Sequence, residues 1–171
     1  MSKLQKIINK IATKDQAIQI VERWKSENKT IVFTNGCFDI LHKGHVTYLA
    51  KAAEFGDKLI IGLNTDESVK QQGKGDERPI NSEDARLFVL ASLEVADLVI
   101  LFNDQTPIDL IETLIPTTLV KGADYDENEN NPLSKKYIIG SDIVRANGGN
   151  VKTIDLEVGY STTSLISKIK D

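Results

Sequence analysis

Both histidines of the chain lie in one short segment, NGCFDILHKGH, which runs from Asn35 to His45. His42 and His45 are three residues apart, so on the first turn of a helix their imidazoles would share a face. Gly44 between them leaves the backbone open to a bound group. Free amides at a helix start attract anions, and imidazoles beside them can donate hydrogen bonds to phosphate oxygens as charge develops. The segment therefore predicts a site that stabilises a reacting phosphate.

Two other interpretations compete for the same histidines. They can be ordinary solvated or hydrogen-bonded side chains, as most isolated pairs are. They can also belong to a metal site, but such sites usually recruit cysteine or carboxylate ligands, and Cys37 is the only cysteine of the chain. A strand-like run before the segment and a helix-like run after it favour the phosphate interpretation.

A second group of polar side chains, Tyr160-Ser161-Thr162-Thr163, precedes the last helix-like segment. Hydroxyl and amide groups at a helix start can hold phosphate oxygens. By itself, the group is equally typical of a plain helix cap. Together with the histidine segment, it predicts a second set of contacts to a polyphosphate.

The elements that must position these groups alternate between strand-like and helix-like patterns. Short apolar runs predict five strands, at residues 30–34, 58–63, 98–102, 118–121 and 151–156. Helical segments are expected at 14–28, 46–55, 82–96, after Pro107, before Gly148 and at 161–169. This alternation predicts an α/β fold with a doubly wound, Rossmann-like parallel sheet, because helical crossovers are right-handed in nearly all cases. Ligands of such sheets bind beyond the carboxyl ends of the strands, where the strand order reverses.

Length and composition fit one soluble domain. A capping box at Thr13 and Gln16 begins a helix, so we expect an N-terminal helical extension at 1–28 and a single domain at 29–171. The net charge of −4 excludes a general basic surface for nucleic acid. The sequence shows neither a signal-peptide pattern nor an apolar run long enough to cross a membrane, so we expect a cytoplasmic protein without a membrane partner.

Both groups of residues resemble the cytidylyltransferase-like nucleotidyltransferases. HKGH at 42–45 matches the HxGH signature of that superfamily, and NGCFD at 35–39 matches its lead-in. The YSTT sequence at 160–163 is similar to the segment that precedes the last helix in the superfamily. The resemblance implies transfer of a nucleotide to a phosphorylated acceptor, with release of pyrophosphate.

Within the superfamily, the chain looks most like the adenylyltransferases that make ADP-heptose. This similarity covers about residues 29–168 and includes NGCFDILH, the RPI of 78–80, VKGADY at 120–125 and GYSTT. It implies AMP transfer from ATP to D-glycero-β-D-manno-heptose 1-phosphate, a step toward the lipopolysaccharide core. Many such enzymes are fused to a sugar kinase; a chain of 171 residues has no room for one, so we expect the monofunctional form. Ala123 departs from the pattern, where a second glycine is expected.

The alternatives are a cytidylyltransferase for an alditol or amino-alcohol phosphate, and a catalytically silent nucleotide-binding module. Glycerol-3-phosphate cytidylyltransferases carry arginines where this chain has Glu94 and Leu156, which favours ATP over CTP. The intact HKGH and STT motifs favour an enzyme over a silent module. A dehydrogenase is poorly supported, because no G-x-G-x-x-G follows the first strand.

The resemblance implies that His42 and His45 hold the α-phosphate of the nucleotide. The residues expected to bind the nucleotide are Asn35, Gly36, Cys37, Phe38, Asp39, Gly44, Arg86, Lys121, Tyr160, Ser161, Thr162 and Thr163. We expect Mg²⁺ or Mn²⁺ to accompany ATP, with Asp39 either as a ligand or as a turn cap. Cys37 is expected to be a small packed residue near the nucleotide and not a nucleophile.

Four cations near these motifs have two interpretations each. Lys43 can contact phosphate or face solvent. Lys74 and Arg78, in a glycine-rich loop expected to be mobile, can close over the substrates or form a solvated basic pair. Arg86 can reach the phosphates or form a salt bridge with Glu83. We further expect a homodimer or a larger homo-oligomer with ATP and a sugar 1-phosphate as small-molecule partners.

Overall fold

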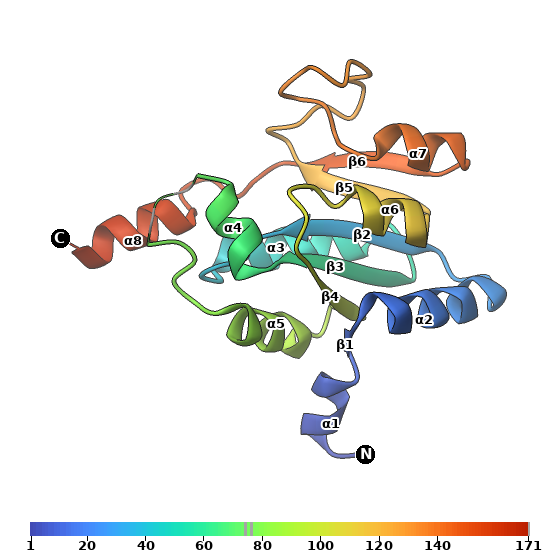
Figure 1. Cartoon of the computed structure of the whole chain (residues 1–171), viewed down its shortest axis with the longest axis horizontal. Coiled ribbons are helices and arrows are strands. Elements are labelled where there is room, and N and C mark those ends of the chain that lie inside the picture. Colours follow the sequence, from blue (N-terminus) through green and yellow to red (C-terminus); the bar gives the residue numbers. More distant parts are fainter. Residues whose placement is uncertain (74, 76, 171) are drawn as a thin grey trace.

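A computed structural model describes residues 1–73, 75 and 77–170 of the chain (Figure 1). Its strands are β1 (Ile11–Ala12), β2 (Ile31–Gly36), β3 (Lys58–Asn64), β4 (Leu98–Phe102), β5 (Thr118–Gly122) and β6 (Asn150–Ile154). Its helices are α1 (Lys3–Ile8), α2 (Lys14–Ser26), α3 (Lys43–Ala53), α4 (Asp66–Gln71), α5 (Glu83–Ser92), α6 (Ile108–Leu114), α7 (Ser141–Ala146) and α8 (Thr162–Lys170).

The strands form a parallel sheet in the order β1-β4-β3-β2-β5-β6. This order confirms the doubly wound, Rossmann-like fold. From β2 the chain moves outward through β3 and β4, then crosses back to place β5 on the other side of β2, so the order reverses between β2 and β5. Prediction of five strands missed β1, whose two residues pair with Val99 and Ile100 of β4 and are too few to show a hydrophobic period.

Helices cover both faces of the sheet (Figure 1). One core layer joins the strands to α2, α6 and α7 and includes Trp24, Phe33 and Ile111. The opposite layer joins them to α3 and α5 and includes Leu49 and Leu90. Because both faces are covered, the central strands read as continuous apolar runs, as in Leu59–Ile61, rather than as alternating ones.

The N-terminal segment packs onto this sheet. Thr13 accepts from the backbone N–H of Gln16, and the Gln16 side chain accepts from the Thr13 N–H, which confirms the predicted capping box. The helix that it begins, α2, buries Ala17, Val21 and Trp24 against the core. Residues 1–28 therefore contribute the edge strand β1 to the sheet and the helix α2 to one of its covering layers.

Four helices differ from the sequence-based expectation. α3 begins at Lys43, three residues before the expected start at residue 46. α1 and α4, six residues each, were not predicted, because neither is long enough to show a clear apolar stripe. The helix expected at 82–96 ends at Ser92, because Leu93 adopts an extended conformation with ψ of 137°. Within the described part of the chain, no helix is long and apolar enough to span a membrane.

Candidate active site

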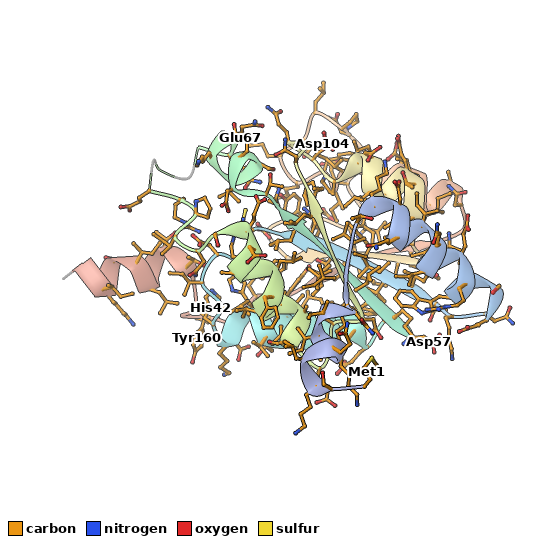
Figure 2. All side chains as sticks on the ribbon, turned by 60° about the horizontal axis from the view of Figure 1, so that its bottom comes forward. Met1, His42, Asp57, Glu67, Asp104 and Tyr160 are labelled. Carbon is orange, nitrogen blue, oxygen red and sulfur yellow. The ribbon has the colours of Figure 1, made fainter. Side chains whose placement is uncertain are left out.

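A cleft of about 730 Å³ opens at the carboxyl ends of the strands. Figure 2 shows His42 and Tyr160 close together at this end of the molecule, while Asp57, which precedes β3, lies at the opposite end. Of the residues expected to bind the substrates, those that line the cleft are Asn35, Gly36, Cys37, Phe38, His42, Gly44, His45, Lys121, Tyr160, Ser161 and Thr162. Most of the predicted nucleotide-binding set thus lies at one cavity, next to the reversal of strand order.

The imidazole of His42 caps helix α3. Its Nδ1 accepts a hydrogen bond of 3.3 Å from the backbone N–H of His45, and His42 itself is extended, with ψ of 172°. Because Nδ1 is the acceptor, the proton of the neutral ring lies on Nε2, which makes Nε2 a donor. The two imidazole rings stack with centroids 3.8 Å apart and planes 16° apart. This arrangement fixes the ring of His42 at the amide-rich start of α3, as the spacing predicted.

Both histidines are uncharged near neutral pH. Burial, with a smaller contribution from the neighbouring His42, lowers the pKa of His45 to about 4. Burial also lowers the pKa of His42 below its ordinary value. Near neutral pH, the pair therefore presents two uncharged rings and no positive charge.

We expect the free energy of unfolding to decrease as the pH is lowered, because His45 titrates differently in the folded and unfolded chain. Unfolded histidine has a pKa of about 6.5, so between pH 6.5 and about 4 the unfolded chain binds the extra proton and the folded chain does not. Because the imidazole remains partly solvated, the expected loss is on the order of 1–2 kcal/mol, below the full value of the shift. Urea unfolding at pH 7 and pH 4.5 should show a smaller loss for His45→Gln than for the parent. Parallel losses in the two proteins would contradict this expectation.

Gly44 is required because two side chains approach it. A Cβ at this position would lie 3.0 Å from the Cβ of Tyr160 and 3.1 Å from the ring of His42. Any larger residue would displace the segment before α8 or the imidazole that caps α3. The glycine of the HKGH sequence thus keeps two walls of the cleft in contact.

The segment that leads into α8 lies beside the histidines, with the ring centroids of His42 and Tyr160 6.2 Å apart. Ser161 Oγ accepts from the Ser164 N–H at 3.0 Å, so it caps the first turn of the helix. Lys43 forms an exposed ion pair of 2.8 Å with Glu157 and lies 5.4 Å from the centre of the Tyr160 ring. Lys43 therefore holds α3 to this segment and does not line the cleft; neither does Thr163.

Lys121 connects the two strands at the reversal of strand order. Its ammonium group donates to Asn35 Oδ1 at 2.6 Å, which joins the ends of β5 and β2. The same group lies 5.5 Å from the centre of the Tyr125 ring. The contact places a cation and an aromatic face side by side in the cleft.

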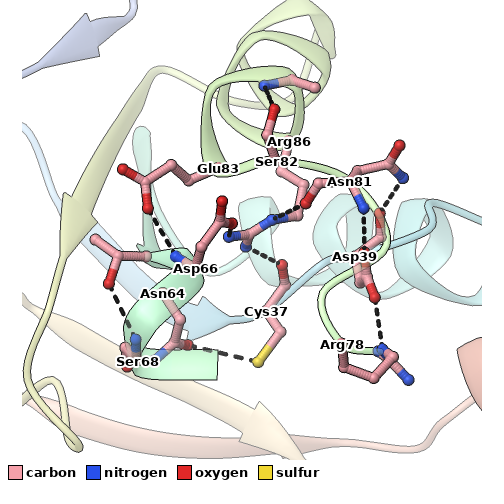
Figure 3. A network of polar contacts seen from close by, with 12 residues as sticks. Cys37, Asp39, Asn64, Asp66, Ser68, Arg78, Asn81, Ser82, Glu83 and Arg86 are labelled. Carbon is pink, nitrogen blue, oxygen red and sulfur yellow. Dashed lines mark hydrogen bonds and ion pairs between the residues drawn. The ribbon is translucent and has the colours of Figure 1, made fainter. Parts of the chain in front are cut away.

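Asp39 holds the segment that follows the glycine-rich loop (Figure 3). Its buried carboxylate accepts from Arg78 Nε at 2.5 Å and from the backbone N–H groups of Ile80 at 2.8 Å and Asn81 at 2.9 Å. Burial opposes ionisation, but the two amides and the Arg78 guanidinium outweigh it and hold the pKa of Asp39 below its usual range. Asp39 thus anchors Arg78 rather than leaving it solvated.

These contacts bear on the expectation that Asp39 binds a metal ion. The oxygens of Asp39 are taken by Arg78 and the two amides, and the residue does not line the cleft, so it does not fit a metal ligand. Among the described residues, no group of three His, Cys, Asp or Glu side chains is placed to hold a metal ion. Lys74 lies outside the described residues, and its expected role in a closing loop stays a prediction.

Arg86 is fully buried and binds the backbone of the turn that leads from β2 to the histidines. Its guanidinium donates to the carbonyl of Cys37 at 2.7 Å, to the carbonyl of Asn81 at 3.0 Å and to Asp66 Oδ1 at 2.8 Å. Glu83 accepts instead from the backbone N–H of Asp66, so the ion pair considered between Arg86 and Glu83 is wrong. Arg86 does not line the cleft, and its guanidinium donates these hydrogen bonds to groups within the protein.

Phe38 lies between these two anchors in a left-handed conformation, with φ of 43°. A non-glycine residue adopts this conformation only where its surroundings hold it there. Arg86 holds the carbonyl before Phe38, and the partners of Asp39 hold the residue after it. The Phe38 ring in turn packs edge-on to His45, with centroids 5.3 Å apart. The buried polar network therefore positions the histidine pair.

The fold and the site together define a nucleotidyltransferase. Comparison with known proteins agrees with this class. The cytidylyltransferase-like family model matches residues 33–168. The chain belongs to the cytidylyltransferase-like family, which confirms the assignment made from HKGH and YSTT.

Curated relatives are similar over nearly all of the chain. It is 48% identical over 162 residues to the bifunctional protein HldE of Caulobacter sp. (strain K31) and 48% identical over 162 residues to that of Campylobacter jejuni, in each case over 95% of this chain. The chain spans about a third of the length of these relatives, 31% and 32% respectively.

Two solved structures share the fold. The lipopolysaccharide core biosynthesis protein of Thermoplasma volcanium is 26% identical, with a TM-score of 0.57 over 75% of this chain and 97% of its own. Pantoate-beta-alanine ligase of Francisella tularensis, at 16% identity, has a TM-score of 0.58 over 90% of this chain and 68% of its own, which shows the fold alone.

Several residues of the cleft were not predicted from the sequence. They include Asn64, Gln72, Gln105, Asp124, Tyr125 and Glu157. For Asn64 and Gln105, a signal was available, because one ends β3 and the other closely follows β4 at the carboxyl edge of the sheet. Gln72 had no such signal, since it follows a helix that was not predicted.

Proposed function

We propose that this chain transfers AMP from ATP to D-glycero-β-D-manno-heptose 1-phosphate, which yields ADP-heptose and pyrophosphate. The observation that carries the proposal is the stacked His42–His45 pair at the start of α3, in the cleft that Ser161 also lines. Similarity to the bifunctional proteins named HldE over 95% of the chain supports it. Likeness to the Thermoplasma volcanium protein of lipopolysaccharide core biosynthesis supports a role in the same pathway.

In the proposed reaction, an oxygen of the sugar phosphate attacks the α-phosphorus of ATP in line. A new P–O bond forms, the bond from the α-phosphorus to the bridging oxygen of the β-phosphate breaks, and pyrophosphate leaves with that electron pair. The sugar phosphate is already an anion, so no side chain needs to activate it. The contribution of the protein is then to position both substrates and to stabilise charge.

His42 supplies the clearest donor for that charge. Its Nε2–H is fixed by the bond from the His45 N–H to Nδ1, so it needs no reorientation when charge develops on the α-phosphate. Ser161 and Thr162 at the start of α8 are proposed to bind the β- and γ-phosphates from the other side. Mg²⁺ or Mn²⁺ would enter with ATP and neutralise part of its phosphate charge.

We expect the enzyme to prefer ATP to CTP by at least about tenfold in kcat/KM, or roughly 1.4 kcal/mol. The reason is Leu156, whose apolar side chain lies beside Gly122 in the cleft where related cytidylyltransferases have an arginine. An apolar surface suits the larger adenine ring and offers no donor to a cytosine carbonyl. Pyrophosphate release with heptose 1-phosphate as acceptor measures the preference, and Leu156→Arg should reduce it.

The same assay separates the alternatives. Equal values for the two nucleotides, or a preference for CTP, would favour the cytidylyltransferase alternative. Nucleotide binding without pyrophosphate release from any acceptor would favour a silent binding module. The homo-oligomer and the cytoplasmic location stay predictions, which size-exclusion chromatography with light scattering and cell fractionation would test.

A further inference from the structure

The strand order divides the cleft into two halves. β3 and β4 lie on one side of β2, and β5 and β6 lie on the other. The turn after β2 ends at His42, and His45 lies in the first turn of α3, so both histidines stand at the end of β2 between the two halves. Two substrates that react at the histidines can therefore occupy one half of the cleft each.

The half beside β5 and β6 is charged and aromatic. Its lining includes Lys121, Asp124, Tyr125, Glu157 and Tyr160. Ser161 and Thr162, the hydroxyl residues proposed for the polyphosphate, belong to this half as well. We therefore place the nucleotide here, which leaves the other half to the acceptor.

The half beside β3 and β4 is lined by amides. Asn64 ends β3, Gln72 follows α4, and Gln105 follows β4. A chain of contacts ties the two strand ends together: Asn64 Nδ2 donates to Ser68 Oγ at 2.8 Å, and that hydroxyl donates to the carbonyl of Asp104 at 2.9 Å (Figure 3 shows the first of these). Of the described residues that line this half, none has an acidic or basic side chain.

Two of the amides are available to a ligand. Cys37 Sγ lies 3.2 Å from Gln72 Oε1, which fixes the oxygen of that amide and leaves its NH₂ group for a further partner. Within the described part of the chain, the side chain of Gln105 makes no hydrogen bond. Asn64 differs, because its NH₂ group is already bound to Ser68 and the residue is buried.

We propose that Gln72 and Gln105 select the acceptor by hydrogen bonding to the hydroxyl groups of a polyhydroxy sugar. This inference rests on the proposed function and adds the residues that define its acceptor. An amide offers both donors and an acceptor, which matches hydroxyl groups that are themselves both. An acceptor substrate that carries an ammonium group would instead need a carboxylate or an aromatic face to bind that group. The described lining of this half supplies neither.

The test compares Gln72→Ala and Gln105→Ala with Gln71→Ala. Gln71 is a matched control, because its exposed amide donates to Glu67 on the same helix and the residue does not line the cleft. Each cleft variant should raise the KM for heptose 1-phosphate about tenfold, the value of one lost neutral hydrogen bond of roughly 1.4 kcal/mol. The KM for ATP should stay within about twofold in all three.

Calorimetric titration with heptose 1-phosphate gives a second readout that needs no turnover. Its Kd should rise by a similar factor in the cleft variants and stay unchanged in Gln71→Ala. An unchanged KM and Kd for the sugar phosphate, or a loss that falls on ATP instead, would overturn the inference. Efficient turnover of phosphoethanolamine by the parent protein would overturn it too. If the parent binds heptose 1-phosphate through these residues yet releases no pyrophosphate, the proposed reaction fails and the inference stands.

Discussion

Replacement of either cleft histidine by alanine is expected to lower kcat at least about 100-fold, the effect of losing one fixed donor to a developing oxyanion. The structure sharpens this expectation for His42, because its imidazole also caps α3. His42→Ala would lose the cap as well, at about 1 kcal/mol of stability. His42→Asn is the better variant, since asparagine can accept the same backbone hydrogen bond without supplying the imidazole donor.

Steady-state pyrophosphate release and thermal melting of the two His42 variants separate catalysis from folding. We expect both to be inactive to a similar degree, with His42→Asn melting closer to the parent. A His42→Asn protein that turns over within a few-fold of the parent would remove the imidazole from the mechanism. His45→Gln serves as the corresponding variant at the second position.

Asp39→Ala is expected to destabilise the fold by about 3–5 kcal/mol, because it leaves the buried guanidinium of Arg78 without its charge partner. It also removes the acceptor for the amides of Ile80 and Asn81. The segment after the glycine-rich loop and the left-handed turn at Phe38 should both loosen, so activity should fall even in the molecules that remain folded.

Urea unfolding and single-turnover kinetics measure these two effects. Asp57→Ala is a suitable control, since Asp57 also accepts backbone and side-chain hydrogen bonds from Thr30 but is partly exposed at the opposite end of the sheet. An Asp39→Ala protein with stability within about 0.5 kcal/mol of the parent would show that the buried pair does not anchor the loop.

The sequence was sufficient for the fold class and the centre of the site. The apolar runs of β2 to β6 are strong enough to be seen without tertiary context, whereas β1 is a strand only because β4 lies beside it. The HKGH spacing predicted that the imidazoles of His42 and His45 lie together, and they stack at the start of α3, because only three residues across the first helical turn separate them.

The cations show where such reasoning stops. Arg78 and Arg86 follow a polar loop, and their sequence context is the same whether they face solvent, phosphate or the interior. The side chain of Arg78 is held in the interior by Asp39, 39 positions away, and that of Arg86 by the Cys37 carbonyl, 49 positions away. Pairings of that range depend on how the helices pack, which no local pattern encodes. The prediction of substrate contacts for these arginines therefore remains without support from the geometry.

The order of the strands along the chain also assigns the two halves of the cleft to different stretches of sequence. The lining beside β3 and β4 is drawn from residues 64–107, and the lining beside β5 and β6 from residues 121–162, with the histidine turn preceding both. With the substrates assigned to the two halves as proposed above, a mutation in one stretch can alter the binding of one substrate without touching the contacts of the other. Descendants of such a protein can thus change acceptor and nucleotide independently, and chimaeras that exchange one stretch between relatives offer a direct way to recombine the two specificities.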